Sequence, residues 1–302
     1  MKRVTLSLVC GVLVGFVASS QAAIIGLWDA AAPGADPANT WVDHSSSGYN
    51  LGSEAGDVGT GPVHNAAGGY YDMELGNGFV GNGDASETIF DFETDVFGAG
   101  AGTPFSMHVY KHRTGFLGGG TTGENMVGKT TDNQGGQFNG WLWGGNGDNA
   151  QRFDFSMQVG NNSERLYHRV QDDAGHPAGI NDVDVLLTVT HDGTGTHAGT
   201  QQYVNGVAAA QPWQLDTLGL NDEGSTVQND SHLRIGWQPW GGNTANSGTD
   251  SNLYFVEIHD TVLSAEDVAA RWNGGSPVRV PEPASLALLA LGGGLLWWRR
   301  RS

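Results

Sequence analysis

Four tryptophans, Trp141, Trp143, Trp237 and Trp240, lie in stretches rich in glycine and asparagine. Exposed indole rings stack on the apolar faces of sugars, and neighbouring amide and carboxylate groups bind sugar hydroxyls. These four residues are therefore candidate ligand-binding residues of a carbohydrate site. Strand alternation places Trp141 and Trp143 on one face, so the alternative is that both belong to a hydrophobic core.

The sequence contains no pair of carboxylates that matches the catalytic motif of a retaining glycoside hydrolase. Retaining glycoside hydrolases hold two carboxylates about 5 Å apart. The nearest arrangement is Asp91, Glu93 and Asp95, which would share the solvent face of a strand. The sequence also lacks a Gly-x-Ser-x-Gly elbow, a phosphate-binding loop and a dinucleotide fingerprint. We therefore expect no enzymatic activity and assign no catalytic residue.

The ten histidines show no zinc-binding spacing. Helical zinc sites use pairs such as His-x3-His, whereas His108 and His112 fall across the end of an expected strand. His191 and His197 flank an expected turn. The sequence therefore predicts surface or turn histidines.

Alternating apolar and polar residues predict the strands that must position these groups. The expected strands are 105–110, 153–159, 184–190, 233–237 and 253–258. The third is almost continuously apolar or β-branched, which indicates burial on both faces. Asn205-Gly206 lies between β-forming residues, the strongest local signal for a hairpin.

One short helix is expected at the end of the domain. Ser264 can cap it, and Asp267 stands at the third helical position, as in a capping box. Gly274-Gly275 would end the helix.

Composition limits the classes of partner. The formal net charge is −18, which disfavours nucleic acid as a partner. The single cysteine, Cys10, excludes disulfides within the rest of the chain. Ten tryptophans and eleven phenylalanines indicate a packed core despite 48 glycines.

The N-terminus has the three parts of a secretory signal peptide over residues 1–23. Lys2 and Arg3 precede an apolar run, and small residues follow, with cleavage expected after Ala22 or Ala23. The rest of the chain is therefore expected to be exported.

The C-terminus carries a second targeting segment over 280–302, after a linker at 276–280. Its parts are Pro281-Glu282-Pro283, an apolar stretch, and then Arg299, Arg300 and Arg301. This tail resembles the PEP-CTERM sorting signal of Gram-negative bacteria that make exopolysaccharide. The resemblance implies transient inner-membrane insertion, cleavage by an exosortase-type enzyme, and delivery to the cell surface or matrix. The alternative is a permanent single-pass anchor.

The region 24–275 resembles a LamG-like (concanavalin A-like) domain. The similar segments are an opening strand and loop at 26–51, paired strands at 188–193 and 202–206, and a last strand running into a helix at 256–268. The resemblance implies an all-β fold, an antiparallel jelly-roll β-sandwich with one short C-terminal helix. The apolar stretch of the tail would form a separate helix.

The same resemblance makes Ca²⁺ a candidate cofactor, because LamG-like domains often hold it through carboxylates and carbonyls at the rim of the sandwich. Asp43 and Asn50 lie in the matching loop, and Asp29 is expected nearby. The alternative is that Asp43 and Asn50 only close an Asx-type turn. Tyr254 and Phe255 stand where many relatives carry an acidic residue, which is a departure from the family.

Together these features predict an exported surface or matrix protein that binds an extracellular polysaccharide or a surface protein. Two alternatives remain: an extracellular glycoside hydrolase or lyase of the same fold, and a structural matrix component without a ligand.

Overall fold

The computed structural model describes most of the expected domain. The described residues are 22–32, 40–54, 60–73, 77–81, 90–92, 102–113, 123–130, 140–146, 152–159, 164–170, 183–194, 197–209, 213–216, 231–236 and 251–272. Residues 1–21 of the expected leader and the whole expected sorting tail lie outside them. Within them, no helix is both long and apolar enough to cross a membrane.

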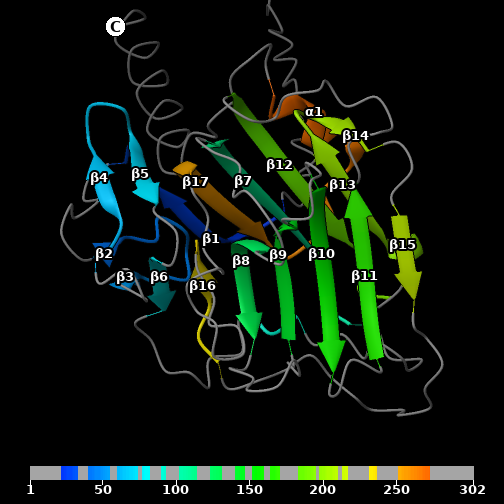
Figure 1. Ribbon diagram of the computed structural model, residues 1–302. Coiled ribbons are helices and arrows are strands. Elements are labelled where there is room, and N and C mark those ends of the chain that lie inside the picture. Colours follow the sequence, from blue (N-terminus) through cyan, green and yellow to red (C-terminus); the bar gives the residue numbers. More distant parts are fainter. Residues whose placement is uncertain are drawn as a thin grey trace, which may run out of the picture.

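The protein is an all-β sandwich of two antiparallel sheets, as the sequence predicts (Figure 1). The first sheet has the spatial order β14 (Val207–Ala208), β13 (Thr200–Val204), β12 (Asp184–His191), β7 (Phe105–Arg113), β17 (Ser251–His259), β5 (Tyr70–Met73) and β4 (Val63–Asn65), and β1 (Ile24–Asp29) also pairs with β17. The second sheet has the order β15 (Trp213–Asp216), β11 (Glu164–Val170), β10 (Arg152–Val159), β9 (Gly140–Asn146), β8 (Gly123–Thr130), β16 (Arg234–Ile235), β6 (Gly78–Gly81), β3 (Leu51–Glu54) and β2 (Thr40–Trp41).

The core lies between the two sheets and is rich in aromatic rings. Phe105 on β7 faces Phe155 on β10, with ring centroids 5.6 Å apart. Polar groups also join the layers, because Trp143 Nε1 on β9 donates to Gln202 Oε1 on β13 at 2.9 Å. The aromatic content of the sequence is thus used to fill one large core, which a chain without disulfides requires.

Four of the five predicted strands are confirmed, with β7, β10, β12 and β17 extending one to three residues past the expected ends. In β12 every residue after Asp184 is buried, because the outer face of the first sheet is itself covered. The fifth, expected over 233–237, contains the two-residue strand β16 within the described residues.

Local signals for the hairpin and the helix are also confirmed. The β13–β14 turn has Asn205 at φ 51° and Gly206 at φ 78°, a conformation that glycine and asparagine tolerate. Ser264 caps helix α1 (Ala265–Ala270), and the reciprocal capping box with Asp267 is present. The helix ends at Ala270, earlier than the Gly-Gly pair predicts.

Helix α1 and its leading segment lie on the outer face of the first sheet. Ser106 Oγ on β7 donates to the Thr261 carbonyl oxygen and accepts from the Leu263 amide, both at 2.8 Å. The helix also approaches the hairpin, because a Cβ on Gly206 would lie 3.0 Å from Ala269 Cα. This cover explains why polar residues on the outer face of β7 and β17 are buried.

Candidate functional site

The predicted calcium loop is organised around one buried carboxylate. Asp43 accepts five hydrogen bonds, from the backbone amides of Leu27, Ser45 and Tyr49 and from the hydroxyls of Ser45 and Ser47. An ionised carboxylate offers about four lone-pair positions. These donors therefore leave no acceptor capacity with which Asp43 could ligate Ca²⁺.

The other two predicted metal ligands serve neighbouring turns. Asn50 Oδ1 accepts from the Asp43 amide at 2.9 Å and closes the loop. Asp29 Oδ1 accepts from the Ala31 amide at 2.9 Å at the end of β1. The geometry at Asp43 and Asn50 is that of an Asx-centred loop and does not fit a calcium site on these groups.

Trp141 and Trp143 lie in the core and not on the surface. Both side chains are 0% exposed. Trp141 Nε1 donates to the Phe90 carbonyl oxygen at 2.8 Å. A sugar needs an open ring face, and these two rings offer none, because both point between the sheets. Trp237, Trp240 and the sorting residues Pro281, Glu282, Pro283, Arg299, Arg300 and Arg301 lie outside the described residues.

Asp91, the described member of the acidic triplet, is not on a solvent face. Its side chain is 2% exposed and forms an ion pair with Lys129 of β8, which is equally buried. The expected strand face is absent at this point, because residues 90–92 lie outside any strand and Phe92 has φ 38°. This carboxylate neutralises a buried ammonium group and is not presented to a substrate.

The structure instead assembles an aromatic row on the outer face of the first sheet. Tyr110 of β7 stacks on Tyr254 of β17 with centroids 4.5 Å apart and an interplanar angle of 26°. Tyr70 of β5 meets the other side of the row, with its ring 5.7 Å from that of Tyr254. Trp272, just after α1, contacts Tyr110 at 6.4 Å. Tyr70, Tyr254 and Trp272 are half-buried, so part of each residue is open to solvent.

A polar pair flanks this aromatic row. The Tyr254 hydroxyl donates to Asp184 Oδ1 at 3.2 Å, and His112 Nδ1 lies 2.9 Å from the same oxygen. Partial burial and the charge of Asp184 raise the pKa of Tyr254 to about 12, so its hydroxyl remains a donor at neutral pH. The row therefore combines open aromatic surface with a carboxylate that is 41% exposed.

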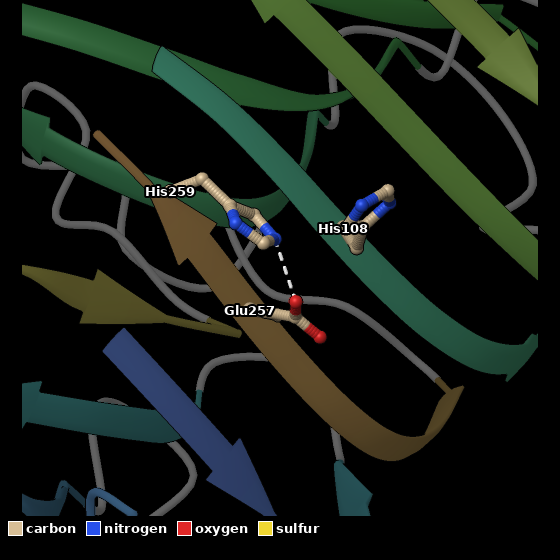
Figure 2. Close-up of side chains that lie close together, drawn as sticks. All are labelled: His108, Glu257 and His259. Atoms are coloured by element: carbon tan, nitrogen blue, oxygen red, sulfur yellow. Dashed lines mark ion pairs between the residues drawn. The ribbon is translucent and has the colours of Figure 1, made fainter. Parts of the chain in front are cut away.

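A second group of polar side chains lies on the same face, beneath the segment that leads into α1. His108 of β7 is opposite Glu257 of β17 in the strand register, and His259 follows two residues later on the same face. Figure 2 shows the three side chains pointing toward one another. We call this group the His-Glu-His cluster. Its members are 1%, 4% and 3% exposed, respectively.

The cluster carries one charge pair and two imidazoles. The Arg271 guanidinium, at the end of α1, contacts Glu257 Oε1. Burial alone would raise the pKa of Glu257, but contacts with His259 and Arg271 hold the pKa below its ordinary value. Burial lowers the pKa of His108 to about 3, against the opposing effect of Glu257, so this imidazole is neutral.

Sequence reasoning missed both groups, because their members come from distant segments. The row joins residues from β5, β7, β17 and the end of α1, and the cluster joins β7 to β17. A search for characteristic residue spacings within one segment finds neither the aromatic row nor the cluster. The one available signal was the alternation in β17, which places Glu257 and His259 on one face.

Comparison with known proteins supports the fold. No protein-family model and no curated protein sequence matches the chain. Among solved structures, a mutant of HCR D/C VPI 5995 superposes with a TM-score of 0.51 and 15% identity, over 82% of this chain and 51% of that one. The binding domain of botulinum neurotoxin serotype G gives 0.49 and 13%, over 82% and 50%. The chain thus spans about half the length of these two proteins.

A smaller structure matches almost over its full length. The CBM40 module of the Ruminococcus gnavus IT-sialidase, bound to α2,3-sialyllactose, superposes with a TM-score of 0.45 and 13% identity, over 68% of this chain and 96% of that one. Of these three structures, the one with a TM-score of 0.51 supports the β-sandwich fold, and at 15% identity it supports the fold alone.

Proposed function

We propose that this is an exported, non-catalytic protein whose β-sandwich binds carbohydrate through the aromatic row of Tyr70, Tyr110, Tyr254 and Trp272. The observation that carries the proposal is the position of these rings. They are gathered from four parts of the chain on one sheet face, they are partly open to solvent, and they lie beside a polar pair.

The row has the properties that stacking on a sugar requires. Tyr254 lies nearly flat on Tyr110, which is 7% exposed, and meets Tyr70 edge-on, yet Tyr254 remains only half-buried. The hydrogen bond to Asp184 fixes the tilt of that ring. A ring already held in place loses little conformational freedom on binding. Asp184 offers a carboxylate acceptor for sugar hydroxyls, and His112, whose Nδ1 faces that carboxylate, offers its other ring nitrogen as an acceptor.

Two properties of the chain favour a neutral or cationic ligand and binding without cleavage. The net charge of −18 opposes nucleic acid and other polyanions. Asp91, the described residue of the acidic triplet, forms a buried ion pair with Lys129 and so is not available to act on a substrate. The targeting segments at the two ends support an extracellular location, with an exosortase-type enzyme as the sorting partner and matrix polysaccharide as the ligand class.

The test is a glycan array followed by calorimetry on the best ligand, with and without Ca²⁺. Tyr254→Ala should weaken binding about fivefold, because one aromatic contact contributes about 1 kcal/mol. Val207→Ala is the control, since Val207 is 67% exposed on β14, at the far edge of the same sheet. We expect this variant to bind like the wild type.

Three results would contradict the proposal. No binding with or without Ca²⁺ would favour a structural component without a ligand. Equal affinities for Tyr254→Ala and the wild type would show that the sugar binds elsewhere than at the aromatic row. The release of new reducing ends from a bound polysaccharide would favour the hydrolase or lyase.

A further inference from the structure

The His-Glu-His cluster contains buried nitrogen atoms without hydrogen-bond partners. His108 Nε2 and both ring nitrogens of His259 make no hydrogen bond. His259 Nε2 lies 2.6 Å from Glu257 Oε1, a contact that Figure 2 marks as an ion pair. A buried polar atom left unpaired costs about 1–3 kcal/mol. Two of these nitrogens, His108 Nε2 and His259 Nδ1, have neither a hydrogen bond nor an ion pair, and together they call for a ligand that satisfies them.

The arrangement of the donor atoms fits one metal ion. One ligand atom from each of His108, Glu257 and His259 can be chosen so that all three lie within 4.8 Å of one another. Ligands of a tetrahedral zinc ion lie about 3.3 Å apart, at bond lengths of about 2.0–2.1 Å. Small side-chain rotations would bring the three donor atoms from within 4.8 Å of one another to about this spacing. We propose that the cluster binds a divalent transition metal, with Zn²⁺ as the preferred ion, and this site goes beyond the proposed carbohydrate function.

Groups outside the three ligands support this assignment. His108 Nδ1 lies 2.7 Å from Thr188 Oγ1 on β12. If Nδ1 carries the proton and donates it, the Nε2 lone pair points into the cluster, as in histidine ligands held by an outer hydrogen bond. Arg271 and His259 both contact Oε1 of Glu257, so Oε2 takes part in neither contact and remains for the ion.

The ligand set selects the class of metal. Two imidazoles and one carboxylate suit Zn²⁺ and its neighbours, whereas Ca²⁺ requires six to eight oxygen ligands. The positive charge of Arg271 opposes a cation, but the carboxylate between them and the net charge of −18 act in the other direction. All three ligands lie on β7 and β17, so a bound ion would join these two strands beneath the segment that leads into α1.

The test is titration of the chelator-treated protein with Zn²⁺ alone, followed by calorimetry and by measurement of retained metal after gel filtration. The wild type should bind about one equivalent. Glu257→Gln and His259→Gln should each weaken binding at least tenfold, since even loss of an outer-shell group costs about 10–100-fold. His191→Gln is the matched control. His191 is also fully buried in the first sheet, but it bonds to Thr200.

A spectroscopic measurement covers the case in which the variants do not fold. Co²⁺ bound to the wild type should show nitrogen ligands from two imidazoles by X-ray absorption and pulsed EPR. A wild type that retains no metal would overturn the proposal and leave the cluster as an ion-pair network. Unchanged zinc affinity in folded variants, or a Co²⁺ shell of oxygen alone, would also overturn it. None of these measurements depends on carbohydrate binding.

Discussion

Acid should destabilise this protein partly through one core histidine, His191. The ring is 0% exposed and lies between aromatic neighbours, 5.4 Å from Phe105 and 6.3 Å from Phe155. Its Nδ1 is 2.8 Å from Thr200 Oγ1. Burial lowers the pKa of His191 to about 4, although the nearby charge of Asp192 acts to raise it. The imidazole is therefore neutral in the folded state over most of the pH range.

The sign of the effect follows from proton linkage. The pKa of a histidine in an unfolded chain is about 6.5. Below that pH, His191 is therefore protonated in the unfolded state but stays neutral in the folded state. The stabilisation is complete above pH ~6.5 and is lost as the pH falls toward ~4. For a shift from 6.5 to about 4, the loss between pH ~7 and pH ~4.5 is about 2.5 kcal/mol.

Urea unfolding of the wild type and His191→Gln at these two pH values isolates this effect. Glutamine keeps a polar group near Thr200 but does not titrate. Every other titrating group is present in both proteins, so the difference between the two pH-dependent losses reports His191. The wild type should lose about 2.5 kcal/mol more than the variant. Equal losses would show that His191 is solvated or already charged in the folded state, and would refute the reasoning.

Two other predictions concern the Asp43 loop and the chain ends. Asp43→Ala should destabilise the protein by at least about 3 kcal/mol, because five donors lose a charged acceptor. Unfolding in Ca²⁺ and in chelator should give the same loss, and stabilisation of the wild type alone by Ca²⁺ would contradict this. Mass spectrometry of the surface-located protein should find a C-terminus near 280–283, and recovery of Arg299–Arg301 would show that the tail is an anchor.

Local features could be predicted from the sequence because neighbouring residues determine them. The hairpin needs two residues that accept positive φ, and Asn205-Gly206 supplies them. The start of α1 depends on Ser264 and Asp267, three residues apart. The strands follow from the alternation of apolar and polar residues. Each of these signals lies within one short segment.

The contents of the site could not be predicted, because they depend on register and on what covers each face. Alternation correctly gave Trp141 and Trp143 a common face, but it could not say that this face is the core. Tyr254 belongs to the aromatic row where the β7–β17 register shifts, between Leu253 and Phe255. An irregularity of this kind changes the face that a side chain occupies. Nothing in the sequence of β17 alone marks it.

The end of α1 connects the two proposed sites. Arg271 contacts Glu257 in the cluster, and Trp272, the next residue, contacts Tyr110 in the row. A change that releases Arg271 can therefore also displace Trp272, so loss of sugar binding in Glu257→Gln would not by itself place Glu257 in the sugar site. The side chain of Tyr254 contacts Tyr70, Tyr110 and Asp184, none of which belongs to the cluster. For this reason Tyr254→Ala tests the row, and zinc binding measured without sugar tests the cluster.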